Sequence, residues 1–258
     1  MKRSCKRVRL SSLYMEVLAV ALLLSACDSS DLVLKDSPEA VELAESWLIV
    51  EQGTTSGVQE SDADVDVEAL TALINKQNPL PEGYTPDDLV YPEVRFIFDD
   101  KIEKRMMRKE AAQALETLFA AASEGGLPLA GVSAYRSHAR QKQLFEGYVK
   151  RHGLEKAQTY SAYPGTSEHE TGLAIDVTGA DGSCAATDCF ADRPEAEWLD
   201  KNAYRFGFII RYPKGKEHIT GYKYEPWHLR YVGEALASEL HQQQLTMEEY
   251  EGVFPVNS

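Results

Sequence analysis

The sequence lacks the excess of basic residues that proteins binding nucleic acids carry. It has 27 Lys and Arg against 41 Asp and Glu, which gives a formal net charge of −14. A protein that neutralises phosphate groups presents Lys and Arg on a basic face. The composition therefore argues against a nucleic-acid-binding function, and we expect no nucleic acid among the partners.

The N-terminal segment also lacks an apolar run long enough to cross a bilayer. Its run covers only residues 17–24, whereas a membrane-spanning helix needs about 20 residues. Five basic residues precede the run, and small residues follow it at Ser25 and Ala26. This order is typical of an export signal. We therefore expect residues 1–26 to be a signal peptide and the protein to act outside the cytoplasm.

The end of this segment, Leu24-Ser25-Ala26-Cys27, resembles the lipobox of bacterial lipoproteins. In that family the Cys is acylated and becomes the new N-terminus, so the resemblance implies lipid anchoring to the bacterial membrane through Cys27. Several acyl chains make such anchoring lasting. An ordinary secreted signal is the alternative, and Glu16, a charge beside the apolar run, departs from the lipoprotein pattern.

Cysteine is scarce, with four residues in the whole chain. Cys5 lies in the expected signal and Cys27 at the lipobox, so Cys184 and Cys189 are the two left for the mature domain. Nearby thiols outside the cytoplasm tend to pair. A disulfide here would close a short loop, and we do not expect this pair to bind a metal.

Acidic residues are concentrated before the globular part of the chain. Residues 28–90 contain fifteen acids and two bases, and residues 27–68 are rich in Asp, Glu, Ser and Thr. Such composition is typical of a solvated segment. We expect a flexible acidic tether over 27–68 and a folded domain over 69–258; recruitment of a basic partner by the tether is the alternative role.

Within the folded part, hydrophobic periodicity predicts helices and strands in irregular order. A helix is expected over 101–124, with Ile102 and Met106 on its apolar face and Gly125-Gly126 as its end. Further helices are predicted over 137–153, from about 192, and over 233–244; strands are predicted over 129–135, 173–177, 208–211 and 227–231. Because no βαβ repetition is present, the fold class is α+β.

Two of the six His have unusual neighbours. His169 lies in the segment Ser167-Glu-His-Glu-Thr-Gly-Leu-Ala-Ile-Asp176, and His228 ends the segment Glu225-Pro-Trp-His. Two imidazoles and one carboxylate are a common ligand set for catalytic zinc, because three protein ligands leave a fourth position open. His169, Asp176 and His228 supply that set, and Gly172 allows the close turn between the first two.

Two further residues complete a hydrolytic site. Glu225 lies three residues before His228, a spacing that puts strand side chains on opposite faces unless Pro226 bends the chain. A carboxylate beside a zinc-bound water can act as general base in amide hydrolysis. Arg136 can bind a substrate carboxylate or the oxyanion of the transition state.

These segments resemble the VanY-like D-alanyl-D-alanine carboxypeptidases over about residues 70–240. The family pattern Ser-x-His-x-x-Gly-x-Ala-x-Asp is matched over 167–176, and the pattern Glu-x-x-His over 225–228. A third pattern, Ser-x-Tyr-Arg-Ser followed by Gln, is matched over 133–137 with Gln141 beyond it. The three patterns occur in the family's order.

The resemblance implies a small, mainly antiparallel sheet flanked by helices, with a zinc site at the sheet. It implies that His169, Asp176 and His228 bind Zn2+, that Glu225 is the base, and that Arg136 contacts substrate or oxyanion. It also implies lesser substrate contacts for Gln141 and Ser167. The expected partners are peptidoglycan stem peptides, the expected reaction is removal of their C-terminal D-alanine, and the expected state is a monomer.

Three other functions remain open from the sequence. An L,D-carboxypeptidase acting on tetrapeptides and a wall endopeptidase share the same metal motifs. A lipoprotein that binds wall peptides without cutting them is less consistent with the sequence, because a binding protein has no need of a general base at Glu225.

Overall fold

A four-stranded antiparallel sheet lies at the centre of the folded domain. The computed structural model describes residues 66 and 69–253, and residues 62–258 form one compact unit. The expected signal peptide, Cys27 and nearly all of the expected tether lie outside the described residues. The strands, in the order β3-β4-β6-β5, are β3 (Leu129–Ser133), β4 (Ala174–Gly179), β6 (His228–Tyr231) and β5 (Phe208–Ile210). A second antiparallel ladder joins β1 (Leu89–Val90) to β2 (Met107–Arg108).

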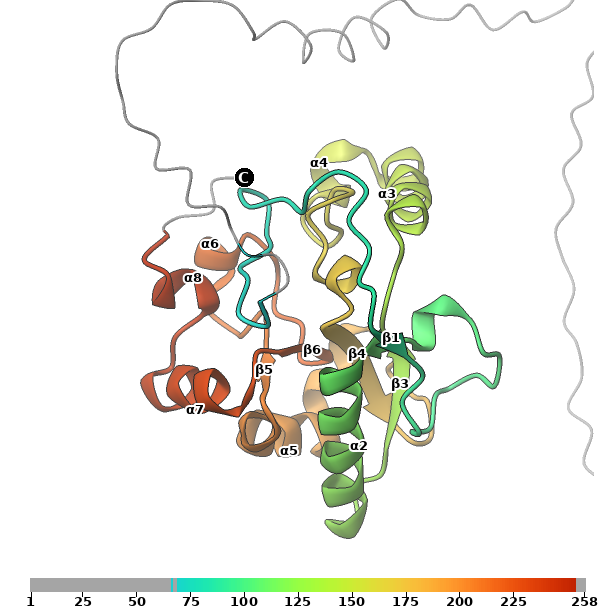
Figure 1. Cartoon of the computed structure of the whole chain (residues 1–258), viewed down its shortest axis with the longest axis vertical. Helices are drawn as coiled ribbons and strands as arrows, with labels where there is room; N and C mark the ends of the chain where they lie inside the picture. The colour runs from blue at the N-terminus through green and yellow to red at the C-terminus, as the bar shows by residue number, and fades with distance from the viewer. Residues whose placement is uncertain (1–65, 67–68, 254–258) are drawn as a thin grey trace, which may run out of the picture. The chain divides into compact units, whose positions relative to one another are not determined.

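Helices surround this sheet, as expected for an α+β fold (Figure 1). They are α2 (Lys109–Glu124), α3 (His138–His152), α4 (Leu154–Ala157), α5 (Pro194–Asn202), α6 (Glu217–Thr220), α7 (Glu234–Gln243) and α8 (Met247–Tyr250). Short 3-10 helices are η1 (Glu103–Arg105), η2 (Glu168–Thr171), η3 (Asp188–Asp192) and η4 (Ala203–Phe206). Among the residues described, no helix combines the length and hydropathy needed to span a bilayer.

The two faces of the sheet differ in chemistry because side chains alternate along each strand. Ile175 and Val177 of β4 and Leu229 of β6 belong to the main hydrophobic core. That core also contains the buried face of α2 and Leu199 of α5. The opposite face of β4 and β6 is therefore the one that carries polar side chains, and the candidate site is built on it.

The predicted helix over 101–124 begins later than expected, at Lys109. Residues 107–108 instead pair with residues 89–90 in the β1–β2 ladder. Ile102, predicted on the core face, is 45% exposed. Strand pairing with a distant segment overrides the local helical pattern here. The end at Gly125 and the helix α3, whose first turn is capped by the Ser137 hydroxyl, agree with the prediction.

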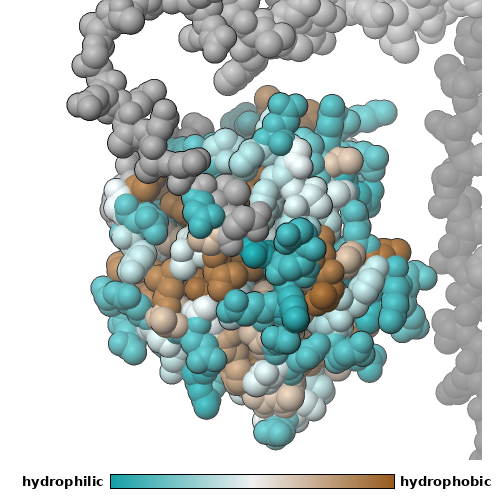
Figure 2. Space-filling model, viewed as in Figure 1, coloured by the Kyte–Doolittle hydropathy of each residue, from teal (hydrophilic) through white to brown (hydrophobic). Residues whose placement is uncertain are grey.

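The start of the domain packs against the sheet without forming a helix, although its apolar spacing resembles a helical one. Leu73 packs with α7 in one apolar cluster, while Ile74 belongs to another cluster with Leu80. On the face drawn in Figure 2, apolar residues form a band across the middle and polar residues surround it. Apolar atoms contribute much of any folded protein's surface, so this exposure is ordinary.

Candidate functional site

Asp176 and His228 face each other on neighbouring strands. They are directly paired in the antiparallel ladder between β4 and β6. Side chains of such a pair point to the same face, with Cβ atoms about 5 Å apart. The His228 Nδ1 atom lies 3.2 Å from Asp176 Oδ1. The strand register alone thus brings two of the three predicted metal ligands together.

His169 reaches the same point from the loop before β4. It lies in η2, which ends at Gly172 with a φ of 71°. A Cβ at Gly172 would lie 2.8 Å from Leu89 Cδ2, so both the backbone angle and the close packing require glycine. This turn directs the chain into β4 and leaves His169 Nε2 3.4 Å from Asp176 Oδ2. The predicted role of Gly172 is confirmed.

The three side chains fit a metal site. One ligand atom from each of His169, Asp176 and His228 lies within 4.8 Å of the others, and all three residues are buried. Asp176 Oδ1 is buried without a hydrogen-bond partner. Burial raises the pKa of Asp176, but the adjacent His169 and His228 outweigh burial and hold that pKa well below its usual range. An ionised carboxylate between two imidazoles is the donor set of an open zinc site.

Glu225 lies beside this cluster through a turn. The His228 amide donates to the Glu225 carbonyl at 3.1 Å, so residues 225–228 form the bend that Pro226 predicted. Glu225 Oε2 lies 3.9 Å from His228 Nδ1. Burial raises the pKa of Glu225 to about 7. A carboxylate with this pKa can accept a proton near neutral pH.

Arg136 lines the cavity and Gln141 holds it there. Arg136 Nη1 donates to Gln141 Oε1 at 2.8 Å, and the Arg136 amide donates to the His169 carbonyl at 3.1 Å. Gln141 is fully buried, donates to the Ala162 carbonyl at 2.6 Å, and is not among the residues that line the cavity. Gln141 therefore supports Arg136, and its expected contact with substrate stays a prediction.

A cavity of about 200 Å³ opens over the cluster. Ser167 lines it, and its predicted contact with substrate stays a prediction. Residues that the sequence motifs did not single out also line the cavity: Tyr148, Tyr160, Tyr212, Tyr222, Lys223 and Trp227. Ala186 also lines it, within the loop that the Cys184–Cys189 disulfide closes. The expected pairing of these two cysteines is therefore present, and their loop forms part of the cavity wall.

Glu168 is, besides Lys223, a charged residue of the site that the sequence motifs did not single out. Its side chain is fully buried, and its Oε2 atom lies 3.5 Å from His228 Nε2. Arg211 and Arg230, both buried, contact its other oxygen. The sequence does carry a signal for such an acid. Arg211 directly follows the apolar strand β5 and Arg230 lies within β6, and an arginine that is buried there requires an acidic partner. Which acid they contact could not be read from sequence spacing.

Comparison with known proteins agrees with this geometry. Residues 104–234, about half of the chain, match the profile of the family VanY, described as D-alanyl-D-alanine carboxypeptidase. The protein YodJ of Bacillus subtilis (strain 168) is 51% identical over 183 residues, which cover 71% of this chain and 67% of YodJ.

Two solved structures are similar in fold and sequence. The LD-carboxypeptidase LdcB has a TM-score of 0.69 and 50% identity, covering 74% of this chain and 89% of LdcB. The vancomycin-resistance D,D-pentapeptidase VanY, in complex with Zn(II), has a TM-score of 0.58 and 34% identity, covering 70% of this chain and 98% of that one. With the family profile and the buried His-Asp-His cluster, these similarities show that the chain belongs to the VanY family of zinc-dependent peptidoglycan carboxypeptidases.

Proposed function

We propose that this chain removes the C-terminal D-alanine of peptidoglycan stem peptides, with Glu225 as general base. The observation that carries the proposal is the position of the Glu225 carboxylate, 3.9 Å from His228 Nδ1 in the cavity that the three candidate ligands share. The proposed ligands are His169, Asp176 and His228. Zinc, when bound, supplies a Lewis acid that polarises a carbonyl and lowers the pKa of water.

Glu225 performs the proton transfers in this proposal. Its carboxylate accepts a proton from the attacking water and returns it to the amine of the departing D-alanine. The pKa of about 7, raised by burial, keeps both transfers feasible near neutral pH. A binding protein without turnover would gain nothing from a buried carboxylate at this position, so the arrangement supports hydrolysis.

Arg136 binds the negatively charged end of the substrate in this proposal. Its guanidinium lines the cavity, and its Nη1 is held by Gln141 at 2.8 Å. A guanidinium held in this way can pair with the terminal carboxylate of a peptide or with an oxyanion. Pairing with the terminal carboxylate selects peptides with a free C-terminus, as a carboxypeptidase requires. Pairing with the oxyanion stabilises the transition state.

Two bonds are candidates for cleavage. The family description and the similarity to the D,D-pentapeptidase support cleavage between two D-alanines of a pentapeptide. The similarity to the LD-carboxypeptidase LdcB, at 50% identity against 34%, supports the L,D bond of a tetrapeptide. Separate incubation with muramyl pentapeptide and tetrapeptide, followed by mass spectrometry, distinguishes them. Loss of one alanine from the pentapeptide alone supports the D,D bond, and loss from the tetrapeptide alone supports the L,D bond.

We also propose that the enzyme acts outside the cytoplasm, anchored by lipid on Cys27. What supports this proposal is the order of basic residues, apolar run and Leu24-Ser25-Ala26-Cys27 in the sequence. A peptidoglycan substrate is consistent with that location.

A further inference from the structure

We propose that Glu168 is a positioning residue that keeps the proton of the His228 imidazole on Nε2 and so leaves Nδ1 free for zinc. The inference rests on the proposed function, because it takes His228 as a zinc ligand. Glu168 touches neither the cavity's candidate base nor Arg136 among the contacts described. Glu168 also lines the cavity, and its side-chain contact with a candidate ligand is the one to His228.

The two nitrogens of His228 have different surroundings. Nδ1 faces the site, 3.2 Å from Asp176 Oδ1 and 3.9 Å from Glu225 Oε2. Nε2, on the other side of the ring, lies 3.5 Å from Glu168 Oε2. Both Nε2 and Oε2 are buried and have no hydrogen-bond partner within bonding distance. An ionised carboxylate only accepts, and His228 has one on each side. When Asp176 and Nδ1 both hold zinc, Nε2 is the nitrogen left to carry the proton, and Glu168 Oε2 is the acceptor that faces it.

The other histidine is oriented in the opposite sense. His169 Nδ1 lies 2.8 Å from the Ala134 carbonyl, which can only accept, so Nδ1 carries the proton there. His169 Nε2 is then the nitrogen that faces Asp176, at 3.4 Å. In each ring, the nitrogen that points away from the site faces an acceptor, and the other nitrogen faces the site. Such acceptors behind metal-binding histidines fix the tautomer and the ring orientation.

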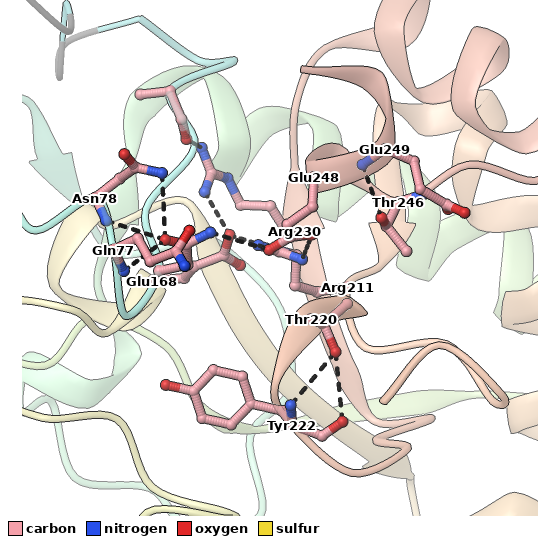
Figure 3. A network of polar contacts seen from close by, with 12 residues as sticks. Gln77, Asn78, Glu168, Arg211, Thr220, Tyr222, Arg230, Thr246, Glu248 and Glu249 are labelled. Carbon is pink, nitrogen blue, oxygen red and sulfur yellow. Dashed lines mark hydrogen bonds and ion pairs between the residues drawn. The ribbon is translucent and has the colours of Figure 1, made fainter. Parts of the chain in front are cut away.

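Glu168 is held ionised, with one oxygen left over for His228. Arg211 Nε and Arg230 Nη1 both donate to Glu168 Oε1, at 2.7 and 2.8 Å. Both guanidinium groups are fully buried together with this carboxylate, so they compensate its negative charge where water cannot. Figure 3 shows the side chains converging from η2, from β6 and from the end of β5. Because both arginines use Oε1, Oε2 faces His228.

The surrounding network keeps that oxygen in place. Arg211 forms a two-pronged ion pair with Glu248 of α8, with donor–acceptor distances of 2.9 and 2.7 Å. Arg230 also donates to two backbone carbonyls, those of Leu70 and Ala72. The four charged side chains are fully buried and their formal charges cancel. Glu168 is therefore tied to several elements, and its position relative to β6 is set by the fold.

The test compares the full chain with two matched variants, Glu168→Gln and Glu248→Gln. Each removes one carboxylate charge from the same buried network, but only Glu168 contacts His228. Zinc affinity is measured by competition with a chelating dye. We expect Glu168→Gln to weaken zinc binding by about 10–100-fold, the usual effect of losing such a partner, and Glu248→Gln to bind zinc nearly as the parent does. Equal losses in both variants would overturn the proposal, since lost charge or packing would then explain them.

A second measurement needs no variant at position 168. In the zinc-loaded parent with labelled histidine, NMR should show His228 coordinated through Nδ1 and protonated on Nε2, with the ring signals assigned by correlation to the backbone. Coordination through Nε2 would contradict the role of Glu168 even if both network variants failed to fold. If instead His228→Ala binds zinc as tightly as the parent, the proposed ligand set fails, which is a separate outcome.

Discussion

Glu225 and His228 lie on one turn, but replacing them should affect zinc content and turnover differently. Glu225→Gln keeps the shape of the side chain and removes the proton acceptor, so kcat should fall by about 10²–10⁴-fold while zinc content stays unchanged. His228→Ala removes a proposed ligand and should lose both zinc and turnover. Peptide hydrolysis and zinc per chain, measured on the same preparations, check both. A Glu225→Gln variant that cuts as fast as the parent would show that another group is the base.

Single residues of the site differ in how well their positions can be predicted from the sequence. The convergence of His169, Asp176 and His228 was predicted from spacing and resemblance, and the buried cluster agrees with it. Gln141 was predicted to contact substrate, which stays a prediction, and the structure adds a hydrogen bond from Arg136 to Gln141. The sequence pattern indicates that Gln141 belongs to the site, whereas its distance from the cavity depends on side-chain packing, which local spacing does not encode.

At the scale of elements, the turn between η2 and β4 depends on one glycine. Gly172→Ala should lower the free energy of unfolding by about 1–3 kcal/mol, because an L-residue is strained at this φ; the new Cβ would also meet Leu89 and Arg108. Thermal denaturation measures the change. Gly147→Ala in α3 is the control: a Cβ there meets nothing within 4 Å, so it should be neutral or stabilise by up to about 1 kcal/mol. Equal melting temperatures for the two variants would contradict this account.

The disulfide loop is a second element with a predicted effect on the site. Cys184 and Ala186 both have positive φ, and Ala186 lines the cavity. Replacing both cysteines by serine should release this wall, so we expect KM for the peptide to rise while zinc content is retained. Steady-state kinetics with zinc analysis tests this. An unchanged KM would mean that the wall keeps its shape without the bridge.

At the scale of the whole molecule, the segment before the first strand contributes to stability. A chain starting at Asp62 retains Leu73, Ile74 and the backbone acceptors of Arg230, and should melt close to the full chain. A chain starting at Lys76 loses them, and each buried aliphatic side chain contributes about 2 kcal/mol. We expect a clearly lower midpoint in urea for the shorter chain. Equal midpoints would show that residues 69–75 are dispensable.

Location is the other prediction for the whole molecule. If Cys27 carries the lipid, Cys27→Ala should move the protein from the membrane fraction to the soluble extracytoplasmic fraction, because the lipid supplies the anchor. Fractionation and metabolic labelling with a fatty acid measure this. Labelled, membrane-bound Cys27→Ala protein would contradict anchoring at this residue.

The sequence by itself determined the family, the metal-binding residue types and the α+β class. These depend on short motifs and on hydrophobic periodicities, which follow directly from the local geometry of helices and strands. Only the tertiary structure decided where α2 begins and that Gln141 forms a hydrogen bond with Arg136. It also decided that Glu168, next to His228, pairs with Arg211 and Arg230. These contacts join residues 43 and 62 positions apart. Their partners are selected by strand register and burial, and the physical reason is that a buried charge must find its counter-ion wherever the fold places one.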